Sequence, residues 1–210
     1  EIQKQPEWIQ NTISRGFCKH IEQMHGNKEA FDLVRKLFEK GENSPFLNEK
    51  VLCSGVGSKF FLAMTSVNPE AVAIGLSELL LSKSFDWLRN NFTGDARRNI
   101  IWALEKLCFA HESYTNAIMV MAALAVAENE NHISNNAYGQ IRQLFHIHLP
   151  GTEATLEQRL ETLHTLTNKG EKYRKLTLDC INSAFHNSGF SRTGGPEKFG
   201  QERKEDYMPS

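Results

Sequence analysis

Residues 114–127 read YTNAIMVMAALAVA, a stretch with apolar side chains on most sides of the helix that its spacing predicts. A helix at a protein surface keeps one polar face, so a helix that is apolar nearly all round must be covered on both flanks. We therefore expect other helices to pack on either side of this segment. The apolar side chains that require this cover are Met119, Val120, Met121, Leu124 and Val126.

The segments on either side of this stretch also have apolar residues at helical spacing. None of them shows the sustained alternation of a half-buried strand, so the sequence predicts an all-helical fold. Helices are expected over residues 6–26, 31–41, 44–64 with a break near 55–57, 68–83, 95–109, 134–150, 155–170 and 173–184.

Several helix starts are indicated by residues that favour the N-cap position, where a short polar side chain accepts a hydrogen bond from a free backbone N–H. Asn68-Pro69 and Ser44-Pro45 are two such signals. Thr155 predicts a start for a helix that buries Leu156, Leu160 and Leu163, and Ser134 a start for a helix that buries Ala137, Ile141, Leu144, Phe145 and His148.

The expected helices form antiparallel pairs that begin near residues 6, 45, 95, 135 and 171. This spacing of about 35–50 residues matches HEAT-like repeats. We expect an α/α superhelix of stacked antiparallel helix pairs over residues 1–187, a HEAT-like solenoid, with an irregular helical bundle as the alternative. Residues 188–210 are predicted to be an irregular polar tail that continues into a longer parent protein, with Phe190, Phe199 and Tyr207 packing on the last repeat.

The charge balance argues against nucleic acid or an anionic membrane as the main partner. The chain has 24 basic and 25 acidic residues for a formal net charge of -1, whereas phosphate binding needs a clustered basic excess. No run of about 18 apolar residues occurs, so no membrane span is expected. The four cysteines lie far apart, which favours a reducing, cytoplasmic location over a disulfide framework.

The motifs that carry chemistry are lacking from the sequence. His146 and His148 point in different directions on a helix, and His148 is interpreted as a packing residue. The stretch GVGSK at 55–59 lacks the spacing of a phosphate-binding loop and is interpreted as a kink between helices. Glu128 and Glu130 are expected to be solvated. We therefore predict a non-enzymatic protein with no cofactor and no bound metal.

A helical stack leaves its surface for binding, since the apolar side chains are used to join neighbouring helices. The polar positions between the apolar stripes that could contact a partner are Arg97, Arg98, Asn135, Asn136, Arg142 and Gln143. One alternative is a nucleic-acid-binding repeat that uses Arg97, Arg98, Arg142, Lys172, Arg174 and Lys175. Another is an all-helical enzyme whose pocket is assembled from distant residues.

An ordered series of short motifs runs through the second half of the chain. They are DARRNIIWALEKL at 95–107, AVAENE at 125–130, SNNAYGQIRQLF at 134–145, LPGTEA at 149–154, FSR at 190–192 and GPE at 195–197. Over roughly residues 70–200 the chain resembles the helical-repeat region of large bacterial antiviral defence proteins of the STAND NTPase type.

The resemblance implies that these repeats act as a sensor or scaffold, while ATP hydrolysis and the effector chemistry belong to other parts of the parent protein. The chain itself has no P-loop motif, so neither activity is expected here. The sequence and the resemblance together predict a module that binds a protein ligand, such as a phage component, or other domains of the parent protein.

Overall fold

A computed structural model describes residues 4–41, 44–133, 136–186, 198–200 and 202–208. These residues are mostly helical, which confirms the predicted all-helical class. The only strands among them are β1 (Lys198–Phe199) and β2 (Glu202–Arg203). The helices are α1 (Glu7–Glu22), α2 (Lys28–Phe38), α3 (Glu49–Leu52), α4 (Gly55–Met64), α5 (Pro69–Leu80), α6 (Phe85–Asn90), α7 (Gly94–Phe109), α8 (His111–Val126), α9 (Ala137–Gln143), α10 (Leu156–Asn168) and α11 (Glu171–Ala184).

Two of the predicted helix starts are confirmed, because the predicted N-cap side chains form their capping hydrogen bonds. The Asn68 side chain accepts a hydrogen bond from the Ala71 amide at 3.0 Å, and Pro69 occupies the first turn of α5. Thr155 forms a reciprocal capping box with Gln158 at the start of α10. Each cap satisfies backbone N–H groups that have no partner inside the helix, which fixes where the helix begins.

Residues 44–64 differ from the expectation in their first part. The Ser44 hydroxyl donates to the Leu37 carbonyl at 3.0 Å and accepts from the Leu47 amide, so it closes a turn instead of starting a helix. The first helix in this region is the short α3, capped by Asn48. The predicted break near residues 55–57 is confirmed, because Ser54 caps α4 there.

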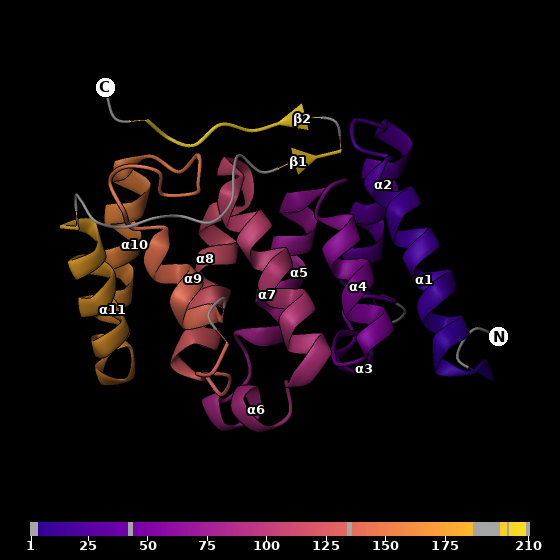
Figure 1. The fold of residues 1–210 in the computed structure, drawn as a ribbon, viewed down its shortest axis with the longest axis horizontal. Coiled ribbons are helices and arrows are strands. Elements are labelled where there is room, and N and C mark those ends of the chain that lie inside the picture. Colours follow the sequence, from indigo (N-terminus) through magenta and orange to yellow (C-terminus); the bar gives the residue numbers. More distant parts are fainter. Residues whose placement is uncertain (1–3, 42–43, 134–135, 187–197, 201, 209–210) are drawn as a thin grey trace.

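The helices pack in two rows. One row places α4 between α1 and α7, and the other places α5 between α2 and α8 (Figure 1). The rows meet where α7 packs on α8, and α9, α10 and α11 continue from α8 to the far end of the molecule. Helices α1 and α11 therefore lie at opposite ends (Figure 1).

The centre of the core is α8, as residues 114–127 predict. Its side chains from Ala117 to Ala125 are buried, apart from the half-buried Met119, and helices α5, α7, α9 and α11 pack around it. Helices α2 and α5, further from this centre, are also closely packed. A Cβ on Gly75 of α5 would lie 2.3 Å from the Phe38 ring, so glycine is required for this approach.

Two expected core positions are in fact exposed. Helix α9 ends at Gln143, so His148 lies beyond it in an exposed loop and does not pack in the core. Leu160 of α10 is 63% exposed, while Leu163 on the same helix is buried. The buried face of α10 is rotated away from Leu160 because Arg159, Thr162 and Leu166 take the inward positions.

The C-terminal residues pack differently from the prediction. β1 and β2 form a two-stranded antiparallel hairpin, and Phe199 is fully buried near the ring of His25, at the α1 end of the molecule (Figure 1). The expected attachment of Phe199 to the last repeat is therefore wrong. Only Tyr207 lies near α10, where its amide donates to the Thr152 carbonyl at 2.8 Å. Phe190 is outside the described residues.

Candidate functional site

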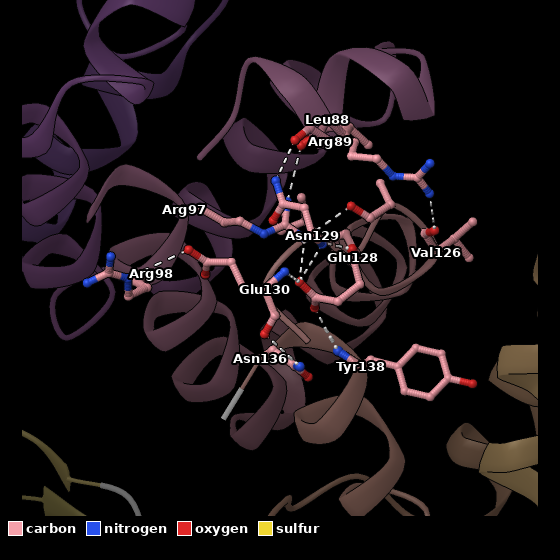
Figure 2. Close-up of polar contacts among 12 residues, drawn as sticks. Leu88, Arg89, Arg97, Arg98, Val126, Glu128, Asn129, Glu130, Asn136 and Tyr138 are labelled. Carbon is pink, nitrogen blue, oxygen red and sulfur yellow. Dashed lines mark hydrogen bonds and ion pairs between the residues drawn. The ribbon is translucent and has the colours of Figure 1, made fainter. Parts of the chain in front are cut away.

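Arg97 of α7 is the first of the predicted contact residues, and the structure places it inside the protein. Its side chain is fully buried, so the expectation that it contacts a partner at the surface is wrong. The guanidinium donates to the carbonyls of Leu88 at 3.2 Å and Leu124 at 2.9 Å (Figure 2). Because Leu124 lies in the last turn of α8, the positive charge compensates the negative end of that helix.

Glu128 is the acidic partner of Arg97. Its Oε1 lies 3.2 Å from Arg97 Nη2 and accepts hydrogen bonds from the backbone amides of Asn129 and Glu130 (Figure 2). Its other oxygen accepts from the Tyr138 amide at 3.3 Å, in the first turn of α9. One carboxylate therefore joins the end of α8 to the start of α9: Oε1 binds Arg97 and the amides after α8, and Oε2 binds the Tyr138 amide.

The expectation that Glu128 and Glu130 are solvated is wrong. Their side chains are only 5% and 12% exposed, because the 127–133 connection folds back over the ends of α7 and α8. Burial lowers the pKa of Arg97 from its ordinary value, and the Glu128 carboxylate opposes this shift. We name Arg97, Glu128 and their backbone partners the Arg97 clamp, and its contacts are those of a structural group.

The other predicted contact residues lie around this clamp. Arg98 is about half exposed and pairs with Asp95 at 3.3 Å and with Glu130 at 3.8 Å. The Asn136 side chain caps α9 by accepting from the Gly139 amide. Arg142 and Gln143 are half-buried on α9. Asn135 lies outside the described residues, so Arg98 is the most accessible of the set where the structure describes it.

Arg159 is a buried cation that the sequence reasoning missed. It is 3% exposed and donates to the carbonyls of Leu144 at 3.4 Å and His146 at 2.5 Å. Its guanidinium also lies 5.4 Å from the centre of the Tyr207 ring. Burial lowers the pKa of Arg159 from its ordinary value. This residue fixes the loop after α9, and no motif in the sequence distinguishes it from a surface arginine.

The glycine-rich stretch at 55–57 is explained by packing, as the sequence predicts. A Cβ on Gly57 would lie 2.1 Å from the Val51 carbonyl, so α4 can follow α3 this closely only with glycine. The Gly57 amide is used by the Ser54 cap at 2.9 Å. Lys59 points to α1 and donates to Asn11 Oδ1 at 2.9 Å. These groups line a hollow of about 580 Å³ that holds both acidic and basic side chains.

The four cysteine thiols are free and are held in the protonated form. Burial raises the pKa of Cys18 to about 11 and that of Cys180 to about 12. Cys108 is fully buried, and its pKa is also raised by burial. The interpretation of Cys108 and Cys180 as small buried apolar residues is confirmed. A nucleophilic thiol needs a lowered pKa, so none of these environments activates one.

No group of three or more His, Cys, Asp or Glu side chains in the described ranges lies close enough together to hold a metal ion. In the same part of the chain, no helix has the length and apolar character needed to cross a membrane.

Large apolar side chains are exposed at both ends of the helical rows. On α1 only Ser14 is buried, while Trp8 is 70% and Phe17 55% exposed. Leu33 of the neighbouring α2 is 57% exposed. A shallow apolar hollow on α1 is lined by Ile13, Gly16, Phe17 and His20. At the opposite end, Leu160, Leu178 and Phe185 are also exposed.

Comparison with family models, curated proteins and solved structures finds no match for this chain. The function is therefore inferred from the surfaces and contacts of the molecule.

Proposed function

We propose that the chain is a non-catalytic helical-repeat module that recognises a protein partner or scaffolds other domains of a parent protein. The observation that carries this proposal is the exposure of large apolar side chains at this end of the molecule, Trp8 and Phe17 of α1 and Leu33 of α2, together with the shallow apolar hollow beside Phe17. Exposed aromatic and aliphatic side chains that lie together mark protein interaction sites more often than catalytic ones.

The packing of the rows supports this assignment. Helix α4 is covered by α1 on one side and by α7 on the other, whereas the main neighbour of α1 in the described part of the chain is α4. As an end helix, α1 has no following repeat on its outer side, where exposed polar residues such as Lys19 are flanked by the exposed rings of Trp8 and Phe17. A protein partner that packs around the exposed sides of α1 would bury Trp8 and Phe17.

The finer architecture is part of the same proposal. We interpret the two rows as a degenerate HEAT-like superhelix, in which α1–α2, α4–α5 and α7–α8 are successive pairs. The equivalent contacts α1 on α4 and α4 on α7, with α2 on α5 and α5 on α8, support this interpretation. The exposed ends of such a stack are its natural docking surfaces, since each pair contacts only its neighbours.

The defence role is proposed on the resemblance alone. The motif AENE at 127–130 supplies Glu128 of the Arg97 clamp, and DARRN at 95–99 supplies Arg97. These two motifs therefore contribute side chains that hold the repeats together. We propose that the chain serves as the sensor or scaffold region of a cytoplasmic STAND-type antiviral defence protein, with a phage protein or another domain of the parent protein as its ligand.

Site-specific photocrosslinking tests the docking face. A photoreactive phenylalanine analogue replaces Trp8 or, as the matched control, Phe185 at the opposite end, in the intact protein within phage-infected cells. We expect the Trp8 reporter to capture one defined partner and the Phe185 reporter to give a much weaker band. The combined variant Trp8→Ser and Phe17→Ser should lose the partner in pull-down, and the variant Phe185→Ser should retain it. Equal capture at both ends, or none at Trp8, contradicts the proposal.

A further inference from the structure

Helix α1, at one end of the helical rows, carries a shallow hollow on its surface (Figure 1). The hollow measures about 280 Å³ and is lined by Ile13, Gly16, Phe17 and His20. Positions three and four apart share one face of a helix, so these four residues form a single stripe along α1. Gly16, Phe17 and His20 are exposed, and Ile13 is half-buried. The stripe is therefore largely open to solvent.

Gly16 leaves a gap at the centre of this stripe. A Cβ at Gly16 would meet nothing within 4 Å, whereas a Cβ at Gly57 or Gly75 would collide with Val51 or Phe38. Glycine weakens a helix interior relative to alanine, so a glycine inside a helix is expected where another group must approach closely. No group of the described residues makes that approach at Gly16. The gap is therefore suited to a side chain of another molecule.

The stripe has the spacing of a helix–helix contact. Residues at i, i+3, i+4 and i+7 are the positions through which one helix packs on another. Ile13 and Phe17 lie next to the glycine along the stripe, so a side chain that enters the gap would contact both of them. Because the lining is almost wholly apolar, an apolar side chain on a helix that crosses α1 at Gly16 fits this arrangement.

The charged side chains of α1 nearest to the hollow in sequence are basic. Arg15 and Lys19 are both exposed, lie one turn apart on the helix, and form no ion pair with any other described residue. The acidic residues of α1, Glu7 and Glu22, lie in its first and last turns, away from Gly16. Acidic side chains on the crossing helix would complement this part of α1.

The same charges argue against a second copy of this chain as the occupant. If two α1 helices crossed at Gly16, Arg15 and Lys19 of both copies would lie close together, and like charges at an interface disfavour association. A helix that carries Asp and Glu residues beside its apolar face is attracted at the same positions. The occupant is therefore a different protein.

We propose that the hollow at Gly16 is a docking site for an acidic amphipathic helix of another protein, which inserts one large apolar side chain between Ile13 and Phe17. This inference rests on the proposed function and specifies the chemistry of the partner. Burial of the apolar side chain supplies affinity. Attraction to Arg15 and Lys19 favours acidic helices over basic ones.

Selection from a library of displayed helical peptides, randomised at their surface positions, tests this proposal on the full chain. We expect the enriched peptides to be acidic and to carry a large apolar residue on one face. Gly16→Gln fills the hollow without adding charge and should weaken their binding by roughly tenfold to a hundredfold, the effect of burying one large apolar side chain. Thr165→Gln, at an exposed position of α10, is the matched control and should bind as wild type.

Charge reversal tests the preference for acidic helices. Arg15→Glu with Lys19→Glu should weaken binding of the enriched peptides by roughly tenfold. Arg174→Glu with Lys175→Glu reverses an exposed basic pair on α11 and should leave binding unchanged. Circular dichroism during heating checks the fold of each variant. Gly16→Gln should unfold no earlier than wild type, because glutamine favours a helix more than glycine does.

Three results would overturn the proposal: no enriched helical peptide, enriched peptides without acidic residues, or binding that survives Gly16→Gln. Dimerisation of the chain that Gly16→Gln abolishes would overturn it as well, since the occupant would then be a second copy. The proposed function is tested separately. If the partner that the Trp8 reporter captures still binds Gly16→Gln, the recognition role stands and the assignment of this site is wrong.

Discussion

Arg97 and Glu128 form an ion pair that is closed to solvent, with 3.2 Å between Nη2 and Oε1 and side-chain exposures of 0% and 5%. The pair lies where the 127–133 connection passes over the ends of α7 and α8 (Figure 2). Taking two charges out of water is costly, and carbonyls and backbone amides offset part of this cost by hydrogen bonding to both side chains, although Arg97 Nε has no partner among the described residues.

The first prediction concerns this pair. Arg97→Met leaves the Glu128 carboxylate buried without its cation, so we expect a loss of about 3–5 kcal/mol in the free energy of unfolding. Urea denaturation followed by circular dichroism measures it. The double variant Arg97→Met with Glu128→Gln should recover part of the loss, and Arg98→Ala, next in sequence but exposed, should change stability by less than about 1 kcal/mol. Equal effects at positions 97 and 98 would contradict the clamp.

A second prediction compares two glycines in helices. Gly75→Ala places a methyl group against the Phe38 ring, so we expect a destabilisation of about 1–3 kcal/mol from overpacking. Gly16→Ala meets nothing within 4 Å and should stabilise α1 by about 0.5–1 kcal/mol, because alanine restricts the unfolded chain more than glycine does. Thermal unfolding of the two variants should shift in opposite directions, and a shared sign would argue against the α2–α5 contact.

The third prediction compares a buried leucine with an exposed leucine that the sequence places in the core. Leu104 of α7 is fully buried, and Leu104→Ala should cost about 2–5 kcal/mol through lost burial and a residual cavity. Leu160 is mostly exposed, so Leu160→Ala should change stability by about 0.5 kcal/mol or less. Chemical denaturation of both variants provides the measurement, and a large effect at Leu160 would show that α10 is rotated from its described orientation.

The fourth prediction uses the raised pKa of Cys18. With a pKa of about 11, caused mainly by burial and further by Glu22, few Cys18 thiols are ionised at pH 8. Alkylation by iodoacetamide should therefore be slow and rise about tenfold per pH unit up to pH 10, since the thiolate is the nucleophile. Cys108 and Cys180 should react only after unfolding, which peptide mass spectrometry can resolve. Fast labelling of Cys18 at neutral pH would contradict this environment.

The raised pKa of Cys18 also makes the free energy of unfolding depend on pH. The folded-state pKa of Cys18 lies above the ordinary thiol value of 9.0, so the protonated thiol is favoured in the fold. Its contribution is complete below about pH 9 and is lost as the pH rises toward 11. Cys18→Ser should flatten this part of the stability profile, and an unchanged slope would count against the shift.

The all-helical class and the central position of α8 could be predicted because they depend on local patterns. An apolar stretch such as 114–127 is stable only when it is buried among other helices. Caps such as Asn68 and Thr155 bond backbone groups within one turn of their own residue. Ser44-Pro45 carries the same local signal without starting a helix, because the Ser44 hydroxyl bonds the end of α2 instead. Tertiary contacts overrode the local preference there.

The surface residues could not be predicted because charge alone does not reveal burial. Arg97 and Arg98 are adjacent in sequence, yet one lies inside the protein and the other pairs at its surface. The difference depends on Glu128, which is about thirty residues away and reaches Arg97 only after α8 has folded across α7. Phe199 likewise packs near His25 through a contact that no pattern within the tail encodes.

Because the helices pack in rows, resistance to a pulling force should differ between the end helix α1 and the central helix α8. Helix α1 is anchored mainly to α4, while α8 is held by neighbours on several sides. A load applied to the N-terminal end would therefore peel α1 away first and meet its greatest resistance at α8. If the proposed protein partner binds α1, a pull on the complex would therefore detach α1 before it disturbs the packing around α8.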